Sequence, residues 1–212
     1  MDQDNVTTVY FVRHGQTAAN ASHVIQGQTD VPLDETGKLQ ALQVGSRLKK
    51  IPFDAIYSSD LSRAAVTAEQ IACGRTIEFT PRLREWDLGH WQGRNIGQIK
   101  KDFPEEYRMF AGDDPEFAPA EGETSREIQL RAGKFMDHIA ARHPGQTVLC
   151  VSHGGFMIKI LKHVLQHFVF PRRPRMDNTC IAIFQTEDGG KSWQLITWND
   201  TAHLSSSALD DM

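Results

Sequence analysis

Short runs of β-branched and aromatic residues alternate with longer amphipathic stretches along this chain. The clearest runs span residues 6–12 and 147–151, and each is followed by a His-Gly dipeptide. Such runs predict buried strands. Further strands are predicted at 54–57, 77–79, 180–185 and 193–198. The last two flank Asp188-Gly189-Gly190, a turn sequence that predicts a hairpin at one edge of a sheet.

Helices are predicted from 34 to about 50 and at 61–73, 125–142 and 156–166. The third has an apolar face, because Ile128, Ala132, Phe135 and Ile139 recur at spacings of four, three and four. The alternation of strands and helices predicts an α/β fold. We expect a single-domain three-layer sandwich, in which a mostly parallel central sheet carries helices on both faces.

The remaining stretches suggest where the domain ends and what covers it. Residues 92–124 are charged, irregular and too long for a plain connection. They predict a cap of short helices and loops over the C-terminal ends of the strands. A chain of 212 residues fits one domain, which we place at 1–204. Residues 205–212 are predicted to be a flexible tail.

Charge and cysteine content exclude several classes of protein. A formal net charge of -4 gives no global attraction to nucleic acid or to a membrane surface, so we expect neither as a partner. Cys73, Cys150 and Cys180 are far apart and form no Cys-x-x-Cys pair, which argues against a disulfide framework or a thiolate zinc site. The N-terminus is polar and no apolar run could span a bilayer, so we expect a cytoplasmic protein.

Three predicted strand ends carry residues suited to bind a phosphoryl group. Arg13 and His14 follow the first strand, Arg63 follows the strand at 54–57, and His153 follows the strand at 147–151. The carboxyl ends of parallel strands border one crevice, so we expect these side chains to converge. Each guanidinium can bind two oxygens and stays charged. A neutral imidazole can accept a phosphoryl group, and nearby arginines would lower the pKa of His14 and keep it neutral.

A proton donor for the leaving oxygen is predicted at Glu85. A phosphate dianion beside this carboxyl group would favour its protonated form, and the same group could later deprotonate an attacking water. Asp60 and Asp87 are alternatives, although we expect one to cap a turn and the other to begin the helix at Leu61.

Two other features have simpler interpretations. A histidine at a strand end is more often structural than nucleophilic, so the assignment of His14 depends on the whole set of residues. His163 and His167 are four residues apart, as metal ligands on a helix can be, but no third ligand lies nearby in sequence. We interpret them as part of a solvated helix face and expect no metal and no other cofactor.

Several segments together resemble the histidine phosphatase superfamily, whose founding members are the cofactor-dependent phosphoglycerate mutases. The matching segments cover most of the chain and lie at 9–20, 27–33, 58–64, 121–124, 151–155 and 199–204. The resemblance implies a phosphohistidine at His14, with phosphate bound by Arg13, Arg63 and His153. It also implies proton transfer by Glu85 and chemistry without a metal. The further residues predicted to bind substrate are Gln16, Thr17, Asn20, Gly27 and Gly154.

Three functions are compatible with this resemblance: phosphomonoester hydrolysis, phosphoglycerate mutase activity and silent binding of a phosphorylated ligand. Hydrolysis is favoured because Trp86 and Asp87 stand where the mutases have a basic residue, and an acidic Asp87 would repel a substrate carboxylate. The mutases' basic insertion after the cap is also missing, and Arg172 and Arg173 lie elsewhere, beyond the second histidine.

The silent module is disfavoured because His14, Glu85 and His153 are all present. The expected partner is a small phosphorylated metabolite, such as a sugar phosphate, a sugar bisphosphate or α-ribazole phosphate. We expect a monomer or a homodimer.

Overall fold

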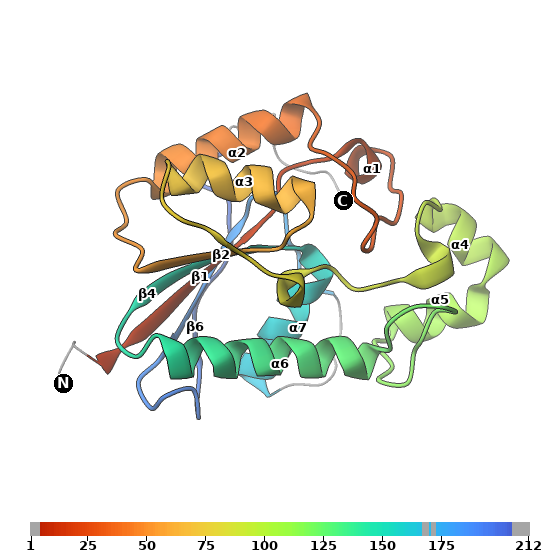
Figure 1. Cartoon of the computed structure of the whole chain (residues 1–212). Coiled ribbons are helices and arrows are strands. Elements are labelled where there is room, and N and C mark those ends of the chain that lie inside the picture. The colour runs from red at the N-terminus through yellow and green to blue at the C-terminus, as the bar shows by residue number, and fades with distance from the viewer. Residues whose placement is uncertain (1–4, 167–169, 171–172, 205–212) are drawn as a thin grey trace.

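A six-stranded sheet forms the centre of the molecule (Figure 1). The computed structural model describes residues 5–166, 170 and 173–204. The strands are β1 (Thr7–Arg13), β2 (Ala55–Ser58), β3 (Glu78–Phe79), β4 (Thr147–Ser152), β5 (Ile181–Thr186) and β6 (Gln194–Asp200). Their order is β3-β2-β4-β1-β5-β6. The first four pair in parallel, whereas β5 and β6 are antiparallel and form the predicted edge hairpin.

Helices cover both faces of this sheet, as Figure 1 shows. One face carries α2 (Glu35–Leu48) and α3 (Ser62–Ala72), and the other carries α6 (Ser125–Arg142) and α7 (Gly154–Leu165). Successive side chains of β1 point to opposite faces of the sheet, so this strand contributes to the apolar layer on each face. Val9 and Phe11 belong to the apolar cluster that includes α6 and α7, and Val12 belongs to the cluster that includes α2 and α3. The predicted three-layer α/β sandwich is confirmed.

Smaller elements lie beyond the sheet, at the side where the parallel strands end. They are α1 (Ala18–Ala21), α4 (Ile96–Asp102), α5 (Pro104–Ala111) and two 3₁₀ turns, Pro81–Leu83 and Gly89–Trp91. In Figure 1, α4 and α5 project to the right of the two helical layers. Tyr107 and Phe110 of α5 share a cavity with the residues at the ends of β1 and β4, so α5 forms one wall of the site.

The structure adds one helix that the sequence did not predict and moves the start of another. The short helix α1 was not predicted, and it is stabilised by a capping box between Thr17 and Asn20. The helix α7 begins at Gly154 rather than at 156. Its first free N–H groups are bound by the Glu85 carboxylate, a partner far away in the sequence. The tail expected at 205–212 lies outside the described residues.

Candidate active site

His14 lies directly after β1, with its side chain only 3% exposed in a cavity of about 480 Å³. Its Nδ1 lies 2.7 Å from the backbone oxygen of Gly15. Because a carbonyl oxygen only accepts hydrogen bonds, Nδ1 must carry the proton, and Nε2 then presents its lone pair. This is the tautomer that a nucleophilic imidazole requires.

The surroundings of His14 keep it neutral. Burial is the main cause of a pKa well below the ordinary value, and the positive charges of Arg63 and Arg13 lower it further. The arginine effect was predicted from the sequence, whereas the larger effect of burial was not. The ring is therefore unprotonated at neutral pH.

Two arginines lie beside this ring and line the same cavity. Arg63, in the first turn of α3, is fully buried and donates to the backbone oxygens of Thr29 (2.8 Å) and Gly27 (2.7 Å). Burial lowers the pKa of Arg63 to about 10, so it remains a cation at neutral pH. Arg13 donates through Nη1 to the backbone oxygen of Met176. Both guanidiniums are therefore held in place by the backbone of neighbouring loops.

His153 follows β4, the strand next to β1, and its ring centroid lies 5.0 Å from that of His14. Its Nε2 lies 2.9 Å from Oγ of Ser59, whereas its buried Nδ1 has no hydrogen-bond partner among the described residues. A buried nitrogen without a partner costs free energy. A phosphate oxygen bound between the two rings would supply the missing partner.

Glu85 completes the set, and its carboxylate lines the cavity. Oε1 accepts hydrogen bonds from the backbone N–H groups of Trp86 (2.8 Å) and Phe156 (2.9 Å), and Oε2 accepts one from Gly155 (2.9 Å). A carboxylate has about four acceptor positions. Three are used, so one position on Oε2 is left to carry a transferred proton.

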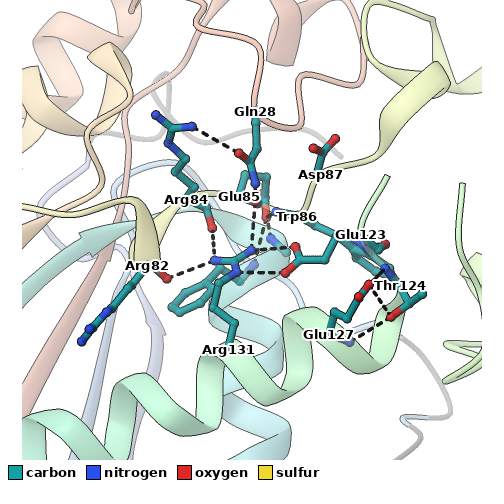
Figure 2. Close-up of polar contacts among 12 residues, drawn as sticks. Gln28, Arg82, Arg84, Glu85, Trp86, Asp87, Glu123, Thr124, Glu127 and Arg131 are labelled. Carbon is teal, nitrogen blue, oxygen red and sulfur yellow. Dashed lines mark hydrogen bonds and ion pairs between the residues drawn. The ribbon is translucent and has the colours of Figure 1, made fainter. Parts of the chain in front are cut away.

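The chain around Glu85 is held by Arg131 of α6, as Figure 2 shows. Arg131 donates to the backbone oxygens of Arg82, Arg84 and Glu85, at 2.8 to 3.2 Å. The same guanidinium forms a bidentate ion pair with Glu123. This contact gives a physical reason for the motif at 121–124, whose Thr124 also caps the start of α6.

The two alternative acids have other contacts, and neither lines the cavity. Asp87 accepts a hydrogen bond from the Gly89 N–H and so caps a turn, as expected. Asp60 does not begin the helix at Leu61. Its carboxylate instead forms a bidentate pair with Arg84, which lowers the pKa of Asp60.

The predicted substrate-binding residues divide into two groups. Asn20, Gly27 and Gly154 line the cavity. Gln16 and Thr17 do not. Thr17 is fully buried and caps α1, and the Gln16 N–H donates to the side chain of Gln40. Binding of substrate by any of the five stays a prediction.

A loop that the sequence did not point to, residues 177–179, holds the backbone of His14. Asn178 donates to the backbone oxygen of His14 at 2.8 Å, and the Thr179 N–H donates to the same oxygen at 3.3 Å. Asp177 in turn exchanges two hydrogen bonds with Asn199. The matching segment at 199–204 therefore has a structural reason, since it braces the loop that holds His14.

Two basic residues just before this loop, Arg173 and Arg175, belong to the site although the sequence did not point to them. Arg173 lies beyond the second histidine in sequence, away from the position of the mutases' basic insertion, but in the structure Arg173 and Arg175 both line the cavity. Arg175 is paired with Asp177, whereas the Arg173 guanidinium lies 5.3 Å from the ring centre of Phe110. Arg172 lies outside the described residues. The cavity therefore contains cations that could meet a substrate carboxylate, although the mutases' basic insertion is missing.

The described residues also bear on two other expectations, the absence of a metal site and of a membrane-spanning segment. His163 is half-buried beside Gly133 of α6 rather than on a solvated face, and His167 lies outside the described residues. Within the described ranges, no group of three or more potential ligands could hold a metal ion. In the same ranges, no helix is long and apolar enough to cross a membrane.

The protein is an α/β sandwich in which two histidines and several arginines lie together at the ends of the parallel strands. Residues 9–201 match the model of the histidine phosphatase superfamily (branch 1), and the chain belongs to that superfamily. It is 34% identical over 210 residues to a probable phosphoglycerate mutase, GpmB, of Cronobacter sakazakii, covering 96% of this chain and 98% of that protein.

Solved structures with the same fold include enzymes named as phosphatases. A phosphoserine phosphatase of Entamoeba histolytica, in complex with 3-phosphoglyceric acid, has a TM-score of 0.84 and 28% identity, covering 94% of this chain and all of that one. A mycobacterial glucosyl-3-phosphoglycerate phosphatase, in complex with VO3, has a TM-score of 0.80 and 30% identity, covering 92% of this chain and 99% of that one.

Proposed function

We propose that this chain hydrolyses phosphomonoesters through a phosphohistidine at His14. The observation that carries the proposal is the hydrogen bond from Nδ1 of His14 to the Gly15 oxygen. It fixes the tautomer in which Nε2 can attack phosphorus, inside a cavity that Arg13 and Arg63 also line. The phosphatases among the structural neighbours support the same reading.

In the first step, Nε2 of His14 forms a bond to phosphorus and the bond to the leaving oxygen breaks. Glu85 gives its proton to that oxygen, and the alcohol leaves. Arg13, Arg63 and His153 bind the three phosphoryl oxygens and stabilise their charge in the transition state.

In the second step, water attacks the phosphohistidine and the bond between phosphorus and nitrogen breaks. Glu85 takes a proton from the water, and inorganic phosphate leaves. The net reaction consumes one ester and one water and yields one alcohol and one phosphate, which restores both His14 and Glu85.

The test is phosphate release from a panel of phosphomonoesters in excess EDTA. His14→Ala should lower kcat by roughly 10³-fold or more, whereas His138→Gln, on α6 and away from the cavity, should have little effect. Glu85→Gln should slow alkyl phosphates by roughly 10²-fold or more. It should slow p-nitrophenyl phosphate far less, because that leaving group scarcely needs a proton. Appreciable turnover by His14→Ala with normal binding would exclude the covalent mechanism.

Phosphoglycerate mutase activity is the second candidate. It is favoured by the identity to a probable mutase and by Arg173, a cation that could meet a glycerate carboxylate. Interconversion of 2- and 3-phosphoglycerate should be assayed with and without 2,3-bisphosphoglycerate. Primer-dependent interconversion without net release of phosphate would establish a mutase and reject the proposed hydrolysis. Inactivity in both assays would favour a silent binding module.

A further inference from the structure

A second, smaller cavity of about 170 Å³ adjoins the main one, and we call it the side cavity. The two cavities share Trp86, Tyr107, Phe110 and Arg173 in their linings. The side cavity also reaches Asp113, in the loop after α5, and Lys159 of α7. The side cavity therefore extends the main cavity into the space between the cap and α7.

Positive charge is concentrated around this side cavity. Lys159 and Lys162 are only 3% and 5% exposed, and both contact the single carboxylate of Asp113. Lys159 lies 2.8 Å from Oδ1 of Asp113 and also donates to Oγ of Ser125 at 2.7 Å. Two buried ammonium groups thus share one carboxylate. Asp113 therefore lies between two buried cations beside the side cavity.

Arg173 adds a third cation. Its guanidinium lies over Phe110, and no residue within the described ranges forms an ion pair with it. Burial, together with the charge of Arg173, lowers the pKa of Lys159 and of Lys162 to about 8. Both lysines are still mostly charged at pH 7. Glu123 also acts on Lys159, but its carboxylate is held by Arg131.

The position of the side cavity suits a second group on the substrate. The Gly155 N–H binds the Glu85 carboxylate, and Lys159 follows four residues later on the same helix. That separation is about one helical turn, or roughly 6 Å along the axis. A group only a few bonds away from the ester oxygen that Glu85 protonates can reach this region.

We propose that the side cavity binds a second anionic group, carried by the leaving part of the substrate, with Arg173 as its direct donor. Lys159 and Lys162 supply the positive field behind it, and the aromatic rings of Trp86 and Phe110 form its walls. The inference rests on the proposed phosphatase function and narrows the substrate class to phosphomonoesters with a carboxylate or a second phosphate. The two lysines also anchor the cap through Asp113, so Arg173 is the residue to change.

The test compares kcat/KM for substrates that differ in one charge. Phosphoserine and phosphoethanolamine differ by a carboxylate, and glucose 1,6-bisphosphate and glucose 6-phosphate differ by a phosphate. Wild-type protein should prefer the more anionic member of at least one pair. Arg173→Gln should lower kcat/KM for that member by roughly 10- to 100-fold, mainly through KM, since bonds to charged groups contribute about 1.5–3 kcal/mol. The same variant should change kcat/KM for the less anionic member by less than about 3-fold.

Arg108→Gln on α5 is the matched control, because Arg108 is exposed and pairs only with Glu105 among the described residues. The pair that responds identifies the anionic group. Equal losses on both members of each pair, or a wild-type enzyme with no preference, would overturn the inference and leave the phosphatase proposal intact. Failure of the wild-type protein to hydrolyse any of these esters or p-nitrophenyl phosphate would instead overturn the proposed function and the inference with it.

Discussion

Gly155 illustrates how a single missing side chain shapes the site. A Cβ atom at this position would lie 2.5 Å from Oε1 of Glu85, which is closer than real Cβ contacts allow, and 3.1 Å from its Cδ, which is tight. The bare Cα therefore lets the carboxylate reach the backbone N–H groups at the start of α7. The position of the proposed acid depends on a glycine that does no chemistry itself.

Gly155→Ala should displace the Glu85 carboxylate and lower kcat for alkyl phosphates by roughly 10- to 100-fold, since misplacement of a catalytic group by about 1 Å has effects of this size. Hydrolysis of p-nitrophenyl phosphate should fall much less. Gly97→Ala is a suitable control, because its Cβ would meet only the Asn95 side chain, at 3.1 Å. An equal loss on both substrates would contradict the link to proton transfer.

The residues that sequence reasoning could place are those at strand ends. His14, Arg63 and His153 follow parallel strands, and the topology of an open sheet brings such positions together. Arg173 and Lys159 have no such signal. Lys159 lies in a largely apolar helix where a lysine would be expected to extend towards water, and its buried partner Asp113 is far away in sequence. Only the packing of the cap against α7 brings these charges together.

At the scale of elements, three parts of the chain hold one carboxylate. The N-terminus of α7 binds the Glu85 side chain, the segment before Glu85 carries it, and α6 holds that segment through Arg131 (Figure 2). Helix N-termini favour negative charge, so α7 and Glu85 stabilise each other. Arg131 acts on the reaction only through the backbone it binds and is a positioning residue.

Arg131→Gln should loosen the 82–85 segment and lower kcat for alkyl phosphates by roughly 10-fold or more, with a smaller effect on KM. The dependence of rate on the pKa of the leaving alcohol should become steeper, because protonation by Glu85 is impaired. A purely structural loss would leave that dependence unchanged. Arg126→Gln, in the first turn of α6, is the matched control, because its ion pair with Glu116 is exposed and surface pairs contribute about 0–1 kcal/mol.

Element boundaries were predictable where local sequence determines them. The strand predicted at 6–12 is observed at Thr7–Arg13, because alternation and β-branching identify it without tertiary information. The start of α7 was not predictable, because its first N–H groups are capped by the carboxylate of Glu85. No residue near 154 in the sequence provides a side-chain cap. For the cap, composition favoured short helices, but composition carries no information on which side chains of α5 face the site.

At the scale of the whole molecule, the site concentrates buried groups that resist protonation. Burial is the main cause that lowers the pKa of His14 and of His153 well below the ordinary value, and it lowers that of His203 to about 4. In the unfolded chain each ring would take up a proton near pH 6.5. A depressed histidine pKa thus contributes stability above that value, and the contribution is lost as pH falls towards the folded-state pKa.

Stability should therefore decrease between pH 7 and pH 5. A histidine that stays neutral in the folded protein costs about 2 kcal/mol at pH 5, since each pKa unit corresponds to 1.36 kcal/mol. Burial of His14 and His153 therefore makes the folded protein less stable as the pH falls through this window, and Tm should fall with it. Carboxylates with lowered pKa, such as Asp60, act below this window, and the buried lysines act above it.

The measurement is Tm by calorimetry in buffers free of phosphate, because a bound anion would favour the protonated rings. His14→Gln removes one of the buried imidazoles and should make the fall in Tm smaller. Unchanged stability between pH 7 and 5 would mean that His14 and His153 take up protons in the folded protein as readily as in the unfolded chain. Burial would then not be what keeps the lone pair of His14 available for nucleophilic attack.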